Sequence, residues 1–176
     1  MSSVVISGDT SGAITLAAPA VSGTNTATLP AATGTVMVSG NMPTFSAYSS
    51  SATTVPDSTF TKILYATKNW DTNNNFASSR FTPTIAGYYQ INGNQRFGSV
   101  TANNVVLRIF KNGSTYITGA TCGLVNGYVY MLVTGLVYLN GSTDYVEIYA
   151  YQNSGVSQNT DIDAAQQFSG CLVRSA

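Results

Sequence analysis

Hydrophobic and polar residues alternate clearly along residues 144–152, near the end of the chain. One set of alternate positions is aliphatic, and the other carries three tyrosines and a glutamate. Because successive side chains of a β-strand point to opposite faces, this pattern predicts a strand with one aliphatic and one aromatic face. The aliphatic set is Val146, Ile148 and Ala150, and the other set is Tyr145, Glu147, Tyr149 and Tyr151.

Further short runs of β-branched and aromatic residues follow Thr44, separated by Gly, Asn, Asp and Ser. Such runs at intervals of about 8–12 residues are typical of a β-sandwich. Asn112-Gly113 is a strong two-residue hairpin signal, and the one helix-permissive run, at 163–167, is short. We therefore expect an all-β sandwich of two antiparallel sheets. Its predicted strands cover residues 45–48, 60–68, 88–97, 105–111, 115–118, 128–139, 144–152 and 167–173.

Residues 1–43 differ in composition from the rest of the chain. They include one charged residue, Asp9, and no aromatic residue, and Gly and Pro separate short β-like pieces at 4–6, 13–16, 26–29 and 35–38. Without large side chains this segment cannot build a core of its own. We expect it to be an extended, β-rich stem that pairs with other chains. The predicted domains are thus a stem or anchoring segment at 1–43 and a head at 44–176.

The 176-residue chain is poor in charge, with 8% charged residues, zero net charge and no histidine. Nucleic acid and anionic membranes bind proteins through clustered Lys and Arg. This chain has no block of five like charges, so neither is an expected partner. Membrane insertion is not expected either, because no stretch is apolar over about 20 residues. A lone subunit usually keeps a well-charged surface, so the shortage favours coverage by identical subunits. Cys122 and Cys171 are expected to be free, buried and reduced, although their spacing leaves a disulfide open.

The stretch from Tyr65 to Ile91 carries a spaced pattern of aromatic, acidic and glycine residues: Tyr65, Asp71, Phe76, Phe81, Gly87, Tyr89 and Ile91. The pattern resembles the signature of the globular head of the first complement component's q subunit, a jelly roll of the tumour-necrosis-factor superfamily. The gap between the two phenylalanines is two residues shorter than in the family, and Ile91 stands where the family has Phe. The resemblance implies a jelly-roll head that forms a homotrimer about a threefold axis. Some relatives also hold calcium near that axis.

The N-terminal segment carries a second resemblance. Its sequence, GAITL followed by APAVSGTNT and TLPAATGTV, resembles a segment of tailed-bacteriophage structural proteins. That segment is found in tail fibres and in surface fibres or decorations. The resemblance implies a virion protein, assembled in the host cytoplasm and exposed on the particle surface. Residues 1–43 would then contact other virion structural proteins. The predicted anchoring residues are Ile14, Leu16, Leu29 and Val36.

Two aromatic features are candidate contact sites. Tyr145, Tyr149 and Tyr151 would form a stripe on one face of their strand, and an exposed apolar stripe usually marks an interaction. The stripe is predicted to be the trimer interface, while receptor contact and packing within the sandwich stay open. Trp70, in an Asn-rich turn, is predicted to contact a ligand by stacking on a sugar, although it could equally fill a loop.

Catalysis is not expected. A chain without histidine cannot form Ser–His or Cys–His nucleophiles, and it lacks the ligands of a structural zinc site. Asp161 and Asp163 could ligate calcium or act as a glycosidase acid and base, but a solvated loop is the simpler interpretation. Asn112 and Asn140 match the glycosylation pattern, yet each precedes Gly where a hairpin turn is expected. We predict no catalytic residue, no metal site and no cofactor.

Together these features predict a short trimeric tail fibre whose head contacts host surface polysaccharide without covalent chemistry. The alternative is a trimeric capsid decoration, that is, a head fibre or cement protein. A ligand-binding module without a virion and a polysaccharide-cleaving enzyme using the two aspartates are further alternatives.

Overall fold

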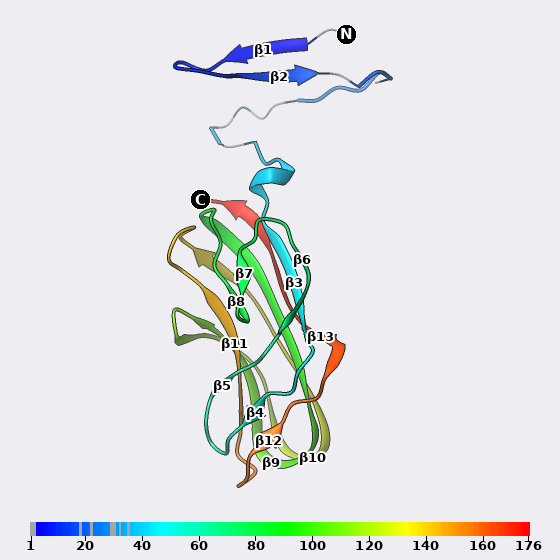
Figure 1. The fold of residues 1–176 in the computed structure, drawn as a ribbon, viewed down its shortest axis with the longest axis vertical. Helices are drawn as coiled ribbons and strands as arrows, with labels where there is room; N and C mark the ends of the chain where they lie inside the picture. Colours follow the sequence, from blue (N-terminus) through cyan, green and yellow to red (C-terminus); the bar gives the residue numbers. More distant parts are fainter. Residues whose placement is uncertain (1–2, 18, 22, 29–30, 32, 35) are drawn as a thin grey trace. The chain divides into compact units, whose positions relative to one another are not determined.

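The computed structural model describes residues 3–17, 19–21, 23–28, 31, 33–34 and 36–176. The chain divides into two compact units, unit 1 at Met1–Gly34 and unit 2 at Thr35–Ala176 (Figure 1). A single 3-10 turn, η1 (Ser39–Asn41), and the residues up to Pro43 group with unit 2. No α-helix occurs in these ranges, so nothing described there could cross a membrane as a helix.

Unit 1 contains one antiparallel hairpin, β1 (Ser3–Ser7) and β2 (Ala13–Ala17). Its turn closes with a 3.0 Å hydrogen bond from the Gly8 amide to the Gly12 carbonyl oxygen, and Gly12 has a φ of 78°. These strands confirm the β-like pieces at 4–6 and 13–16. The pieces at 26–29 and 35–38 are not strands where they are described, because no second segment supplies the ladder hydrogen bonds that a strand needs.

Unit 2 is built from eleven strands, all paired antiparallel. In chain order they are β3 (Thr44–Ser49), β4 (Thr54–Val55), β5 (Thr61–Lys62), β6 (Thr67–Asp71), β7 (Phe76–Ala77), β8 (Arg80–Phe81), β9 (Gly87–Lys111), β10 (Ser114–Leu139), β11 (Val146–Gln152), β12 (Gln158–Asn159) and β13 (Asp163–Ser175). The all-β expectation is therefore confirmed. The permissive run at 163–167 lies in β13 rather than in a helix.

The long strands β9 and β10 run through both layers of the sandwich (Figure 1). The first part of β9 pairs with β13 and the last part pairs with β11, while β10 follows β9 along its whole length. We call the layer that holds β6, β3, β13, early β9 and late β10 layer I. Layer II holds β7, β8, β5, β11, late β9 and early β10. The separately predicted strands 88–97 and 105–111 are thus parts of one bent strand, β9, and those at 115–118 and 128–139 are parts of another, β10.

The hairpin between β9 and β10 confirms the Asn112-Gly113 prediction. Lys111 pairs with Ser114, and the two turn residues have φ values of 52° and 79°. Positive φ at both central positions is the type I′ geometry that matches the twist of the flanking strands. This turn therefore fixes which residues of β9 and β10 face each other.

An aromatic cluster between the layers forms the centre of the core. Phe45 stacks on Phe81 at 4.2 Å and on Phe76 at 5.1 Å, and it meets the edge of Phe168 at 4.9 Å between ring centroids. Such pairs add stability beyond the area they bury. The aromatic and aliphatic residues of the signature, Tyr65, Phe76, Phe81, Tyr89 and Ile91, are all buried in this core.

The predicted strand at 60–68 is wrong as one element. β5 ends at Lys62 and β6 begins at Thr67. In between, the Leu64 amide donates to the Thr53 hydroxyl at 2.9 Å and the Tyr65 amide donates to the Ser79 hydroxyl at 3.0 Å. Side-chain hydroxyls thus accept the hydrogen bonds that the carbonyl groups of a neighbouring strand would otherwise accept. A pattern of β-forming residues does not reveal this.

The two cysteines are free, as expected, but the expected burial is wrong. Cys171 is exposed and Cys122 is half-buried. Cys171 lies opposite Gln90 and Thr44 on the outward side of layer I, while the next residue, Leu172, points inward and is buried. The alternation of β13 therefore sets the exposure of this thiol.

Ile148→Ala tests the core between the layers. Ile148 is fully buried and its side chain approaches Gly93 of the other layer. Removing it should lower the free energy of unfolding by about 2–5 kcal/mol, measured by urea denaturation. Ile162→Ala, the same change at an exposed side chain, should cost less than about 0.5 kcal/mol. Equal effects at both positions would contradict this packing.

Candidate functional site

A buried carboxylate on the outward side of layer II organises the surface around β11. Glu147 is almost fully buried, and its Oε1 accepts from Lys62 Nζ at 3.1 Å and from Arg80 Nε at 2.9 Å. The two cationic side chains stay partly exposed. A buried charge needs such partners, because moving a charged group out of water without a partner costs several kcal/mol. We call Glu147, Lys62 and Arg80 the Glu147 cluster.

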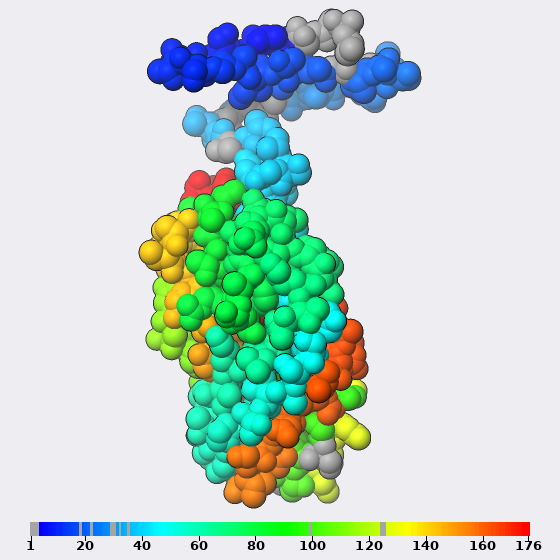
Figure 2. All heavy atoms as spheres, in the orientation of Figure 1, coloured from blue at the N-terminus to red at the C-terminus, as the bar shows by residue number. Residues whose placement is uncertain are grey.

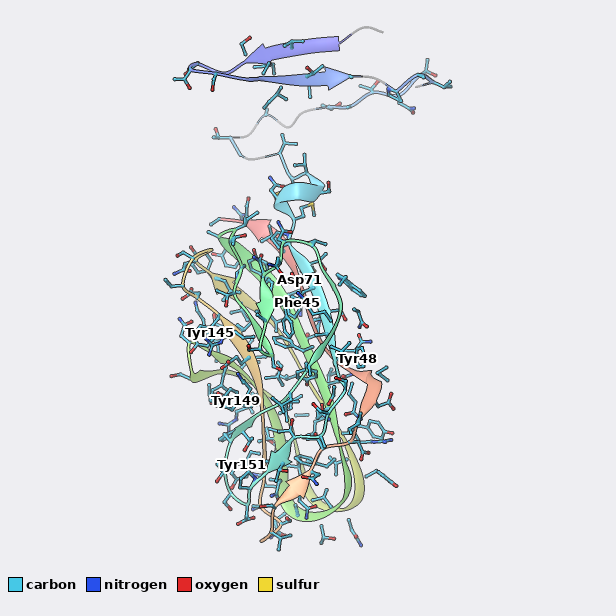
Figure 3. All side chains as sticks on the ribbon, viewed as in Figure 1. Phe45, Tyr48, Asp71, Tyr145, Tyr149 and Tyr151 are labelled. Carbon is cyan, nitrogen blue, oxygen red and sulfur yellow. The ribbon has the colours of Figure 1, made fainter. Side chains whose placement is uncertain are left out.

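The predicted tyrosine stripe runs along the strand that carries Glu147 (Figure 3), and the Tyr149 hydroxyl donates to Glu147 Oε2 at 3.4 Å. Tyr149 stacks on Phe110 at 4.0 Å, Tyr151 lies 5.0 Å from Phe60, and the Arg80 guanidinium lies 3.8 Å from the ring centre of Tyr145. All three tyrosines are half-buried within a single chain. Burial, followed by the charge of Glu147, raises the pKa of Tyr149. The structure therefore brings the stripe together, and its own chain already covers part of it; its role as trimer interface remains a prediction.

The β7–β8 hairpin separates two hollows next to the cluster. They have volumes of about 560 and about 490 Å³, and Lys62, Ala77 and Ser78 line both. Ser78 and Ser79 form the hairpin turn with φ values of 51° and 58°, and Lys62 Nζ donates to the Ser78 carbonyl at 3.2 Å. All the residues that line the two hollows belong to the part of the chain between β3 and β9, which covers much of the face seen in Figure 2. Ammonium, amide and hydroxyl groups in the hollows are donors that saccharide hydroxyls can use. The polar residues that line the two hollows include Lys62, Lys68, Asn74, Asn75, Ser78 and Arg80.

Trp70 lies in β6, opposite Ser46 of β3, rather than at the tip of a turn. Its ring is 52% exposed, and its indole Nε1 is 3.4 Å from the Thr44 hydroxyl. The turn itself follows at Asp71, whose carboxylate accepts the Asn75 and Phe76 amides, each at 2.9 Å. Trp70 does not fill a loop, so its ring is free to contact a ligand.

The two aspartates proposed as a carboxylate pair have separate partners. Asp161 forms an ion pair with Arg96, whereas the Asp163 carboxylate accepts the Ala165 amide at 2.9 Å. No group of three potential metal ligands occurs among the residues that the structure describes. Asn112 and Asn140 both lie at turns, where the Asn112 amide group donates to Asp144 at 2.7 Å.

The predicted anchoring residues lie partly outside the described chain. Ile14 and Leu16 of β2 are exposed, as is Val36. Leu29 lies outside the described residues. Ile14 and Leu16 belong to unit 1, whereas Val36 belongs to unit 2.

Sequence reasoning missed the partners of the tyrosine stripe. Lys62 and Arg80 reach Glu147 from strands 85 and 67 positions away in the chain. One signal was present: a charged residue at an alternate position of a strand needs a partner when that face is covered. The partner's identity depended on pairing β5 and β8 with β11, which no local pattern specifies.

No protein-family model and no curated protein sequence matches the chain. Solved structures do match. The globular domain of zebrafish complement 1qA protein has a TM-score of 0.59 at 14% identity, covering 76% of this chain and 98% of that chain. Murine APRIL has a TM-score of 0.57 at 12% identity, covering 74% and 98%.

A third match is PRD1 vertex protein P5, with a TM-score of 0.53 at 14% identity, covering 77% of this chain and 98% of that one. Identities this low show the fold alone. Together with the strand order they establish that unit 2 is a jelly roll.

Glu147→Gln tests the buried carboxylate. The substitution keeps the shape but leaves Lys62 and Arg80 without their negative partner. Because both cations are partly exposed and can be hydrated, the free energy of unfolding should fall by only about 1–3 kcal/mol in urea denaturation. Asp163→Asn, a matched change whose amide oxygen can still accept from Ala165, should change stability by less than about 0.5 kcal/mol. A stability unchanged in both variants would show that the cluster contributes nothing.

Proposed function

We propose that this chain is a structural protein of a tailed-phage particle, with unit 1 docking on the particle and unit 2 forming a homotrimeric head. Its most favoured role is a short tail fibre whose head contacts host surface glycans without covalent chemistry. No catalytic step and no cofactor are part of the proposal.

The observation that carries this proposal is the hairpin of unit 1. Every side chain described in β1 and β2 is exposed, including Val4, Val5, Ile6, Ile14 and Leu16. An isolated two-stranded hairpin is marginally stable in water, and this one buries neither of its faces. Its exposed aliphatic residues and free strand edges suit addition to another protein's sheet. The resemblance of this segment to phage fibre and decoration proteins supports a virion component as the partner.

Glycan contact is supported by chemistry on the surface of unit 2. Trp70 offers an exposed ring for stacking on a sugar, and the hollows beside β7 and β8 are lined with hydrogen-bond donors. Hollows that combine donors with apolar lining residues suit weak contacts, which three copies in one head would strengthen together.

A capsid decoration is the second candidate. A phage vertex protein among the structural neighbours and the shortness of the 176-residue chain favour it. A ligand-binding module without a virion, in keeping with the complement and APRIL neighbours, would not need the exposed hairpin. Immunogold labelling of particles with an antibody against unit 2 distinguishes tail from capsid.

Ile14→Asp with Leu16→Asp in the full chain tests docking by unit 1. The wild-type chain should be incorporated into particles, whereas the double variant should remain free because charged residues cannot be buried against an apolar partner. Immunoblots of purified particles measure the incorporated fraction, which should fall at least tenfold. Val21→Asp, at another exposed residue of unit 1, is the control and should be incorporated normally. Particles that lack the wild-type chain would overturn the virion assignment.

Trp70→Ala tests the glycan contact. Loss of the exposed ring should reduce binding of the full chain to host cells about tenfold, since one stacking contact contributes on the order of 1 kcal/mol or more and three copies act together. Circular dichroism should still show a folded head, although the thermal unfolding midpoint should fall somewhat because about half of Trp70 is covered and its indole Nε1 contacts Thr44. Val156→Ala, at an exposed residue that lines neither hollow, is the control and should bind cells as the wild type does. Unaltered cell binding by the Trp70 variant would exclude this contact.

A further inference from the structure

The outward side of late β10 carries a row of large apolar side chains in water. Apart from the half-buried Gly135, residues 128–139 alternate, with one set buried in the core and the other exposed. The buried set is Val129, Met131, Val133, Val137 and Leu139. The exposed side chains are Tyr128 at 69%, Tyr130 at 71%, Leu132 at 58%, Leu136 at 51% and Tyr138 at 38%. We call the outward residues from Tyr130 to Tyr138 the β10 stripe.

This stripe lies on an edge strand. Within the described chain β10 pairs with β9 alone, so one side of its backbone is unpaired. No residue from Tyr128 to Leu139 is charged. An apolar edge strand without charge or proline is an aggregation hazard unless something covers it. The stripe therefore needs an occupant.

The stripe reads the same in both directions. Its residues are Tyr130, Leu132, Thr134, Leu136 and Tyr138, a palindrome centred on the threonine. Each end also has a cation nearby, with Arg96 donating to the Tyr130 hydroxyl at 2.7 Å and Lys111 Nζ lying 5.7 Å from the Tyr138 ring centre. Two copies of such a stripe match like with like whether they run parallel or antiparallel.

The polar centre of the stripe is satisfied within its own chain. The Thr134 hydroxyl lies 2.6 Å from Asn92 Oδ1 and accepts from Gln90 Nε2 at 2.8 Å. Because the Thr134 hydroxyl both donates and accepts within its own chain, covering it would not leave this hydroxyl unpaired. The leucines on either side can then be desolvated without the cost of burying an unpaired polar group.

We propose that the β10 stripe is the surface through which copies of this chain pack against one another. The inference rests on the homotrimer proposed above and names its contact surface. Aromatic side chains bury about 150–250 Å² each, so the exposed parts of the stripe amount to roughly 500 Å² per copy. That is most of the roughly 800 Å² per partner in a stable interface, and it is at the upper end of patches left on monomers. Self-complementarity favours another copy over an unrelated partner.

This surface lies on the layer opposite Tyr149 and Tyr151 of β11 and the preceding Tyr145. Those tyrosines pack on Phe60, Phe110 and Arg80, whereas Leu132 and Leu136 project into water. One set of variants can therefore separate the two candidate interfaces.

Leu132→Asp and Leu136→Asp, each in the full chain, test the proposal. Light scattering coupled to size exclusion should give a trimer for the wild type and a threefold lower mass for each variant, because carboxylates cannot be buried unpaired between copies. Both side chains are exposed in the single chain, so circular dichroism should show a folded head. If the Asp variants aggregate, Leu132→Asn and Leu136→Asn should still raise the concentration for half-dissociation at least tenfold.

Val156→Asp, an exposed apolar residue away from the stripe, and Tyr145→Asp, on the other layer, are the matched comparisons and should remain trimeric. A trimer that survives both leucine changes overturns this surface but not the assembly. A monomeric wild type overturns both. A dimer dissociated by the leucine changes would support the surface and overturn the threefold arrangement. Dissociation by Tyr145→Asp alone would move the interface to β11.

Discussion

The antiparallel pairing of β9 with β10 is the constraint on which the head depends. The register runs from Leu139 opposite Gly87 to Lys111 opposite Ser114, so one ladder spans both layers. Because side chains alternate along each strand, this register decides at once which residues enter the core and which face water. A slip of one residue would bury Leu132 and expose Met131, and would do the same along the whole strand. The type I′ turn at Asn112-Gly113 sets the register at one end, while the shifts near residues 115, 118 and 127 let the pair bend.

Local chemistry made several parts of this fold predictable. The Asn-Gly turn and the alternation of Val146, Ile148 and Ala150 depend on neighbours within a few positions, whereas the burial of the aromatic signature was implied by its resemblance to a known family and depends on distant rings such as Phe45 and Phe168. The break between β5 and β6 was not predictable, because hydroxyls of Thr53 and Ser79 replace a partner strand there. Nor was the continuity of β9, since the strand passes from one layer to the other without a turn that a composition pattern would mark.

The β10 stripe escaped sequence reasoning for a different reason. Residues 128–139 are apolar on both faces of the strand, so a period-two pattern of hydrophobic and polar residues does not show. Around Tyr145, Tyr149 and Tyr151, by contrast, the period-two pattern is clear, because these tyrosines alternate with aliphatic residues. In the structure the more exposed surface is the other one. Tyr149 and Tyr151 have ring partners in their own chain, whereas the leucines of β10 are exposed to solvent. Burial in three dimensions, rather than contrast along the chain, identifies the surface that lacks a partner.

Self-association through β10 and docking through unit 1 would reinforce each other. The β1–β2 hairpin offers only a few aliphatic side chains, among them Val4, Ile6 and Ile14, so one copy would bind a partner weakly. Three hairpins carried by one trimer bind with a higher effective concentration once the first has docked, which can strengthen attachment by about 10²–10⁴ without new contacts. The same reasoning applies to Trp70, because each trimer would present three rings to one host surface. If the charge-poor head assembles first as proposed, its weak anchors and weak ligand contacts would act together.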